Sequence, residues 1–202
     1  MKKTSKTPQY IVGIDEVGRG PLAGPVTLCA VVCSAEFYKK LARYEGLTDS
    51  KKLTEKNREH WYTLAKLMKA EGLISFVVVS KSNTHIDRYG ISASIKTAVV
   101  ACLEKLEIDP LHTKVLLDGS LHAPAIYINQ ETIIKGDQKE KIISLASIIA
   151  KVTRDRYMVK IAKKYPVYGF DIHKGYGTKI HRDAIKKHGM SDLHRKSFCG
   201  KI

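Results

Sequence analysis

Residues 25–33 read PVTLCAVVC, a run that is nearly continuous in apolar and β-branched side chains. A strand with one face in water alternates apolar and polar residues, whereas a strand that is buried on both faces carries an unbroken apolar run. The run therefore predicts a central strand that is covered on both faces. Such a strand requires a layer on either side of its sheet, which is typical of an α/β domain.

The rest of the chain predicts the other strands and the helices of this domain. Strands are predicted over residues 10–15, 73–79 and 114–118, with two weaker ones around 125–129 and 132–135. Apolar stripes, capping residues and terminating glycines predict helices over residues 54–72, 91–106, 139–164 and 178–188. The predicted fold is an α/β fold with a mixed central β-sheet flanked by helices.

The 202 residues contain no internal repeat and no linker rich in Pro, Gly or Ser. We predict a short basic N-terminal tail over residues 1–9 and a single domain over residues 10–202, which ends in a helical and loop segment. The four cysteines form no C-x-x-C pair and are predicted to be reduced core residues, so a cysteine-ligated zinc site is not expected. No apolar stretch reaches the ~18 residues of a membrane span, and we predict a cytoplasmic protein.

The charge balance is the unusual feature of the composition. Lys and Arg number 35 against 20 Asp and Glu, which leaves a net charge of +15. Such an excess predicts a polyanionic partner, with nucleic acid as the first candidate and an anionic membrane surface as the second.

Acidic residues stand where two predicted strands end. Asp15 and Glu16 lie where the first strand is expected to turn into a loop, and Asp118 is the last residue of another strand. Carboxylates that converge at strand ends suit the oxygen coordination that Mg²⁺ and Mn²⁺ prefer. Taken singly, each of these acids is more often a turn or cap residue.

Asp155 is a fourth candidate acid within a predicted helix. It shares one helical stripe with Ser147 and Lys151, because four residues separate each neighbour from the next. The stripe is polar in an otherwise apolar helix, as expected for an edge that faces a site. A surface ion pair between Lys151 and Asp155 explains the stripe equally well.

Two glycine-containing loops each have a structural and a functional interpretation. Residues 18–24, GRGPLAG, match neither a Walker A loop nor the dinucleotide fingerprint. They form either a hairpin connection or a loop whose bare backbone approaches a nucleic-acid strand, with Arg19 as the cation. Residues 173–179, HKGYGTK, form either a solvated basic loop or a surface on which Tyr176 lies flat against a sugar or base.

Together these motifs resemble those of the bacterial ribonuclease HII family. The matching segments are GIDEVGRGPLAGPV at 13–26, TDSKKL at 48–53, LDG at 117–119, KGD at 135–137, ASIIAKVTRDR at 146–156, YGF at 168–170, HKGYGT at 173–178 and HRKSF at 194–198. They follow the family's order and span nearly the whole chain. The Gly-Arg-Gly triplet favours type II over the related type III enzymes, whereas Val17 stands where the family usually has alanine.

The resemblance implies a ribonuclease H-like fold and an endonuclease that cuts RNA in RNA–DNA hybrids and cuts 5′ of single ribonucleotides in duplex DNA. Its products would end in a 3′-hydroxyl and a 5′-phosphate, which fits ribonucleotide excision and RNA primer removal. The catalytic and metal-binding acids would be Asp15, Glu16, Asp118 and Asp155. We predict Mn²⁺ or Mg²⁺ as the cofactor, with two ions about 4 Å apart in the substrate complex.

The resemblance and the basic character of the chain also imply its substrate contacts. Gly18, Arg19, Gly20 and Tyr176 would read the junction between ribonucleotide and DNA, and further contacts are predicted for Lys51, Ser147, Lys151, Arg154, Lys174 and Lys179. The expected partners are RNA–DNA hybrid and ribonucleotide-containing duplex DNA, with no membrane, no obligate protein partner, no clamp-binding peptide and a monomeric chain. A basic nucleic-acid-binding protein without catalysis, or another nuclease of the same fold, would be the alternatives.

Overall fold

The computed structural model describes residues 8–200 and 202, so most of the predicted tail lies outside the described residues. Its centre is a five-stranded sheet in the order β3-β2-β1-β4-β5. The strands are β1 (Tyr10–Val17), β2 (Val26–Ser34), β3 (Ile74–Lys81), β4 (Thr113–Asp118) and β5 (Gln130–Ile133). The first three strands pair in antiparallel fashion, and β4 and β5 run parallel to β1, which confirms the predicted mixed sheet.

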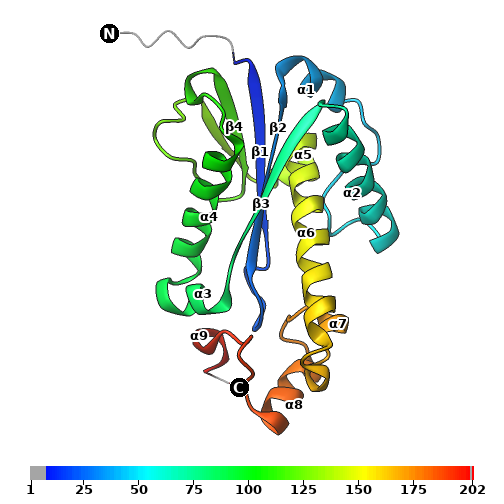
Figure 1. The fold of residues 1–202 in the computed structure, drawn as a ribbon, viewed down its shortest axis with the longest axis vertical. Coiled ribbons are helices and arrows are strands. Elements are labelled where there is room, and N and C mark those ends of the chain that lie inside the picture. Colours follow the sequence, from blue (N-terminus) through cyan, green and yellow to red (C-terminus); the bar gives the residue numbers. More distant parts are fainter. Residues whose placement is uncertain (1–7, 201) are drawn as a thin grey trace.

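Helices cover both faces of this sheet (Figure 1). They are α1 (Ala35–Leu41), α2 (Glu55–Ala70), α3 (Asn83–Tyr89), α4 (Ile91–Leu106), α5 (Gly136–Lys139), α6 (Lys141–Ala162), α7 (Phe170–His173), α8 (Lys179–His188) and α9 (Lys196–Cys199). One apolar core joins α6, α1 and α2 to one face, and a second joins α3 and α4 to the other. No described helix combines the length and the apolar character that crossing a membrane requires.

Strand β2 confirms the interpretation of its apolar run. Every residue from Val26 to Cys33 is buried. Alternate side chains enter different cores, because Val31 packs in the α6 core and Leu28 in the α4 core. The four cysteines are buried thiols, as predicted.

The predicted strand at residues 125–129 is wrong. This segment is a loop in which, among the described residues, only Asn129 bonds to a strand, through its carbonyl to Val115 of β4, and the side chain of Gln130 bonds to the loop backbone. Gln130 accepts the N–H of Ala123 at 2.8 Å and donates to the carbonyl of Tyr127 at 3.0 Å. The Gln130 side chain thus provides backbone hydrogen bonds that a neighbouring strand would otherwise provide.

Two short helices, α1 and α3, were not expected from the sequence. Each begins after a serine whose hydroxyl accepts a backbone N–H of the first turn, Ser34 from Phe37 and Ser82 from His85. Both serines are N-caps, Ser34 as the last residue of β2 and Ser82 directly after β3, so the caps were present in the sequence. The helices were missed because seven residues are too few to show an apolar stripe.

Helix α6 lies directly against the central strand β1. A Cβ atom at Gly13 would lie 2.6 Å from the carbonyl carbon of Ile142, which is closer than real Cβ contacts come. The absence of a side chain at Gly13 is therefore what lets the two backbones touch. This contact fixes the distance between the sheet and the segment that enters α6.

Replacing Gly13 with alanine should force β1 and α6 apart. We expect the free energy of unfolding of Gly13→Ala to fall by about 1–3 kcal/mol, the usual cost of overpacking a tight core. Urea unfolding of the variant and the wild type measures this change. Gly200→Ala is the matched control, because nothing lies within 4 Å of a Cβ at that position; equal losses in both variants would contradict the proposed contact.

Candidate active site

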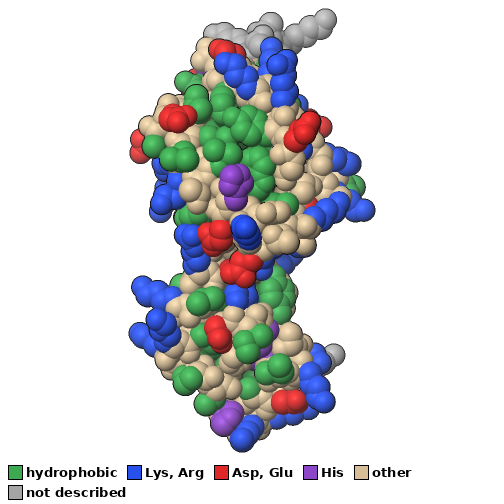
Figure 2. All heavy atoms as spheres, turned by 90° about the vertical axis from the view of Figure 1, so that its right-hand side faces the viewer, with side chains coloured by type: hydrophobic (Ala, Val, Ile, Leu, Met, Phe, Trp, Pro, Cys, Tyr) green, Lys and Arg blue, Asp and Glu red, His purple; other side chains and the backbone are tan. Residues whose placement is uncertain are grey.

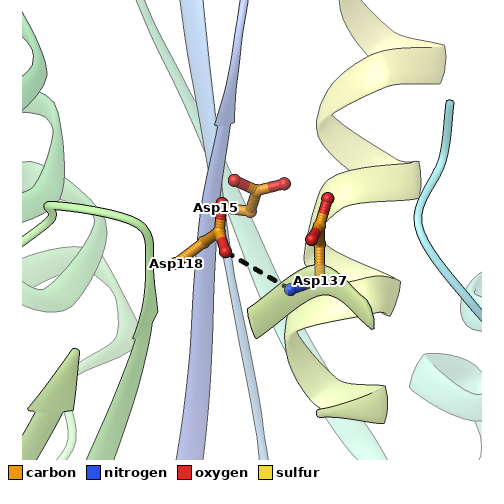
Figure 3. A group of neighbouring side chains, drawn as sticks. All are labelled: Asp15, Asp118 and Asp137. Atoms are coloured by element: carbon orange, nitrogen blue, oxygen red, sulfur yellow. Dashed lines mark hydrogen bonds between the residues drawn. The ribbon is translucent and has the colours of Figure 1, made fainter. Parts of the chain in front are cut away.

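Three carboxylates gather at the middle of the sheet (Figure 3). Asp15 comes from β1, Asp118 ends β4 and Asp137 lies in α5, and one oxygen of each lies within 4.8 Å of the others. Asp15 and Asp118 are neighbours because β1 and β4 are parallel and pair Ile14 with Leu117, one residue earlier. Asp137 reaches them from the segment that enters α6.

The turn around Asp137 wraps the carboxylate of Asp118. One Asp118 oxygen accepts the N–H of Gly136 at 2.6 Å and the N–H of Asp137 at 3.3 Å. A Cβ at Gly136 would lie 2.7 Å from a methyl group of Ile143 and 3.3 Å from the same Asp118 oxygen. The glycine therefore allows the turn to close on the carboxylate, which holds Asp118 and Asp137 side by side.

Burial and neighbouring charges raise the pKa of Asp15, Glu16 and Asp137. Burial is the largest cause of the raised pKa of Asp15, followed by the charges of Glu16 and Asp118. Burial and then the charge of Asp118 raise the pKa of Asp137 to about 6. Burial also raises the pKa of Glu16, and the nearby Arg19 partly opposes that shift. Such a group of hard oxygen ligands fits a divalent cation, whose charge would offset this repulsion.

A cavity of about 320 Å³ opens beside Asp15. It is lined by Asp15, Glu16, Val17, Ser50, Lys51, Ser147, Lys151 and Tyr176. Ser147 donates to the Asp15 side chain and lies 2.9 Å from the hydroxyl of Ser50. The structure thus brings six of the predicted site residues to one cavity, although they are spread over 162 positions of the chain.

Asp15 and Glu16 reach the site from within a strand and not from a turn. The expectation that β1 ends at Asp15 is wrong, because the strand continues to Val17 and pairs Asp15 with Cys29 and Glu16 with Leu28. Neighbouring side chains of a strand point to opposite faces. Glu16 consequently pairs with Arg19 of the following loop, at 3.2 Å, while Asp15 faces α6.

The structure places Asp155 apart from the carboxylate cluster. Its two oxygens lie 2.9 and 2.8 Å from the Lys151 ammonium, the ion pair that was the alternative interpretation. Eight residues of helix separate Asp155 from Ser147, which is about 12 Å along the axis. Side chains on one helical stripe point the same way but need not lie close together, and Asp155 is not among the three acids that cluster in the described part of the chain.

Asp137 is the acid that sequence reasoning missed. It is only 6% exposed, and it follows no long strand and lies on no helical stripe. The one available signal was the KGD segment at 135–137, which belongs to the motifs that resemble ribonuclease HII.

Arg154 has a different place from the predicted phosphate contact. Its side chain is 1% exposed, and its guanidinium donates to the carbonyls of Pro25, Lys174 and Ala23 at 2.8, 3.0 and 3.2 Å. All three guanidinium nitrogens of Arg154 therefore donate to backbone carbonyl oxygens. The structure corrects the prediction: Arg154 ties the loop before β2 to the loop that carries Tyr176.

The two glycine loops lie against each other. The N–H of Leu22 donates to the carbonyl of Gly175 at 2.9 Å, and a Cβ at Gly175 would lie 2.5 Å from the carbonyl oxygen of Ala23. The Tyr176 ring beside this contact is 38% exposed, with the Lys151 ammonium 5.8 Å from its centroid. Lys174 and Lys179 lie outside the cavity, where Lys174 donates to the carbonyl of Asp171 and Lys179 begins α8.

The fold places the chain in the class of ribonuclease H-like α/β proteins. It is similar to ribonuclease H2 of Pyrococcus horikoshii OT3, with a TM-score of 0.71, 26% sequence identity and 93% of each chain covered. It is also similar in fold to RNase HII of Archaeoglobus fulgidus, solved as a complex with PCNA (TM-score 0.72, 24% identity, 93% and 94% covered). A Bst-RNase HIII solved in complex with Mn²⁺ has a TM-score of 0.69 at 17% identity, with 95% and 68% covered.

Sequence comparison identifies the family. The family model for ribonuclease HII matches residues 12–201. The chain is 49% identical over 190 residues to ribonuclease HII of Bacillus cereus strain B4264, which covers 94% of this chain and 69% of that protein. Ribonuclease HII of Bacillus anthracis strain A0248 matches equally well. The chain belongs to the ribonuclease HII family and is a ribonuclease H, an enzyme that acts on RNA–DNA hybrids.

Asp137 and Asp155 can be compared directly for metal binding. We expect Asp137→Asn to weaken Mn²⁺ binding at least about tenfold, since it removes one carboxylate of the cluster, and Asp155→Asn to leave it within about twofold. Isothermal titration calorimetry with Mn²⁺ on each variant measures both affinities. The opposite order would return Asp155 to the metal site.

The stabilisation of the fold by Mn²⁺ should depend on pH. Because the pKa of Asp137 is raised to about 6, its contribution to folding without metal is present at low pH and is lost as the pH rises through 6. Stabilisation by Mn²⁺ should therefore be larger at pH 7 than at pH 5, where the ion must displace a proton. A melting-temperature shift that is independent of pH would contradict this prediction.

Proposed function

We propose that this ribonuclease H also cuts duplex DNA on the 5′ side of a single embedded ribonucleotide and leaves a 3′-hydroxyl and a 5′-phosphate. The proposal rests on the direct contact between two loops beside the carboxylate cavity. The bond from Leu22 to Gly175 ties the loop that contains residues 18–20 to the loop that carries Tyr176. A nucleotide whose phosphate lies over the carboxylates would contact both loops with its sugar. The enzyme could therefore recognise a single junction between a ribonucleotide and DNA.

Asp15, Asp118 and Asp137 would hold a divalent metal, Mn²⁺ or Mg²⁺, with Glu16 close by. The mutual repulsion of the buried acids and their oxygen chemistry support this assignment. When bound, the metal supplies positive charge at the phosphate and activates water for phosphodiester hydrolysis. We still propose two ions in the substrate complex, with Asp137 and not Asp155 as the fourth metal-binding acid.

The protein's own groups orient the reaction. Ser147 donates to Asp15 and keeps its carboxylate turned toward Asp118 and Asp137. Lys51 and Lys151 line the cavity, where their ammonium groups would meet the phosphates on either side of the cut. Lys151 also forms an ion pair with Asp155, which would hold the Lys151 side chain at the cavity edge. Positioning of this kind supplies most of the rate in phosphoryl transfer.

The two loops would tell ribose from deoxyribose. A 2′-hydroxyl both donates and accepts hydrogen bonds, so backbone groups of Gly18, Arg19 and Gly20 can recognise it at close range. The Tyr176 ring would stack on the neighbouring deoxyribose, where an extra hydroxyl would collide with it. Together these contacts would make the enzyme specific for the junction between a ribonucleotide and DNA.

The charge of the surface supports a nucleic-acid duplex as the partner. On the face drawn in Figure 2, Lys and Arg side chains are spread over both the upper and the lower part of the molecule. Lys174 and Lys179 belong to the lower, C-terminal part, where they would meet duplex phosphates beyond the cavity. Binding should therefore weaken steeply as the salt concentration rises. A cellular role in ribonucleotide excision and primer removal follows from these substrates.

A cleavage assay tests the proposed function. End-labelled duplex DNA with one ribonucleotide is compared with all-DNA duplex and with a long RNA–DNA hybrid, each in Mg²⁺, Mn²⁺ or chelator. We expect one metal-dependent cut 5′ of the ribonucleotide, and Asp15→Asn should lower its rate at least about 100-fold while duplex binding is kept. Asp183→Asn, the same change at an exposed position of α8, is the control. Cleavage of the hybrid alone would sink the proposed junction activity.

Substitution of Tyr176 tests the stacking role. Tyr176→Phe should keep most of the activity on the single-ribonucleotide duplex, whereas Tyr176→Ala should lose about tenfold or more, because a stacked ring contributes about 1–3 kcal/mol. Steady-state kinetics on that duplex measure both variants. Tyr89→Ala, at an exposed tyrosine of α3, serves as the control. Equal losses in the Phe and Ala variants would assign the role to the phenolic hydroxyl and not to the ring.

A further inference from the structure

Arg195 is completely buried, and the hydrogen bonds of its charged group all go to backbone carbonyls, with the Phe198 ring centroid 5.1 Å from the guanidinium carbon. It lies just before α9, and its guanidinium donates to the carbonyls of Gly24, Arg19 and Gly18 at 3.0, 2.9 and 2.6 Å. Within the described part of the chain, no carboxylate forms an ion pair with it. All three acceptors belong to the loop between β1 and β2.

Stability alone does not account for this arrangement. Burying a cation without an ionic partner is costly, and an apolar side chain of similar volume is often at least as stable. Burial and the nearby charge of Arg154 lower the pKa of Arg195 to about 10, so the group stays charged at neutral pH. The loop is therefore held by a cation that is retained at a cost, which points to a requirement for its conformation.

Two of the three bonds fix the direction of two consecutive peptide groups. The Gly18 carbonyl shares its peptide plane with the N–H of Arg19, and the Arg19 carbonyl shares its plane with the N–H of Gly20. No cis peptide bond occurs in the described chain, and in a trans peptide the C=O and N–H point in opposite directions. With both carbonyls turned toward Arg195, the two N–H groups point away from it.

These two N–H groups are available to a ligand. Arg19 and Gly20 are exposed residues, and neither backbone N–H donates to another described residue. The Arg19 side chain is engaged with Glu16, which leaves the backbone as the donor at this point of the loop. Successive N–H groups that point the same way form a concave site for an oxygen acceptor.

We propose that Arg195 is a positioning residue for ribose recognition, which turns the N–H groups of Arg19 and Gly20 outward so that they donate to the 2′-oxygen of the ribonucleotide. The inference depends on the proposed function, in which this loop lies against the ribonucleotide. Arg195 does not touch the substrate itself. A deoxyribose offers no 2′-oxygen, so the correct orientation of these donors distinguishes the two sugars.

Arg195→Lys tests the role of the planar guanidinium. Lysine keeps the charge, but a single ammonium cannot reach three carbonyls with the same fork of donors. We compare KM for cleavage of the single-ribonucleotide duplex with the inhibition constant of the matching all-DNA duplex. KM should rise about tenfold, the effect of one lost hydrogen bond, while the inhibition constant of all-DNA duplex stays within about twofold, so the ratio of the inhibition constant to KM falls about tenfold.

Arg182→Lys is the matched control. Like Arg195, Arg182 donates to a backbone carbonyl of a glycine-containing loop, that of Gly177 at 2.7 Å. That carbonyl does not belong to residues 18–20. The discrimination ratio should be unchanged in this variant. If Arg195→Lys leaves the ratio unchanged, or raises both constants equally, the positioning role is wrong and Arg195 is only structural.

A measurement on the wild type keeps the inference testable if Arg195→Lys does not fold. The amide protons of Arg19 and Gly20 should exchange rapidly with solvent in the free protein, as measured by NMR. Single-ribonucleotide duplex should slow their exchange, and all-DNA duplex should not. Slow exchange in the free protein, or an equal response to both duplexes, would overturn the proposal. Failure of the proposed function is seen separately, because the wild type would then not cut at the lone ribonucleotide.

Discussion

The direct contact of Gly13 with the backbone of Ile142 is the constraint on which the site depends. Since no side chain separates β1 from α6, the segment entering that helix comes close enough to the sheet for Asp137 to reach Asp15 and Asp118. The same contact carries Ser147 of α6 to the Asp15 carboxylate. A sheet and a helix at ordinary separation would leave these groups too far apart to share one cation.

Opposite charges are used in different ways near the C-terminal end of β1 and in the loop that follows it. Burial and then the charges of neighbouring acids raise the pKa of Asp15 and Asp137, and a bound cation would offset that repulsion. Beyond the strand, Arg154 and Arg195 are buried against carbonyls and tie the C-terminal segment to the loop before β2. The acidic cluster that would bind the metal and the loops that would contact the sugar are thus held in place by separate electrostatic interactions.

The particular successes and failures of the sequence analysis have physical causes. Asp118 ends its strand as predicted, and Asp15 was a sound candidate although β1 continues past it. Asp155 was misplaced because helical periodicity reports the direction of a side chain and not its distance along the axis. Asp137 escaped because its position depends on a glycine turn closing around Asp118, a contact between segments that no local pattern records.

The sequence by itself determined the buried central strand, the mixed sheet with helices on both faces, and the membership of the ribonuclease HII family, since periodicity and ordered motifs are local properties of the chain. Only the tertiary structure decided which acids share a site, and that Arg154 holds backbone in place of phosphate. Those outcomes depend on distances between segments far apart in sequence. Such distances are set by how closely backbones pack, and at Gly13 that closeness comes from the absence of a single Cβ atom.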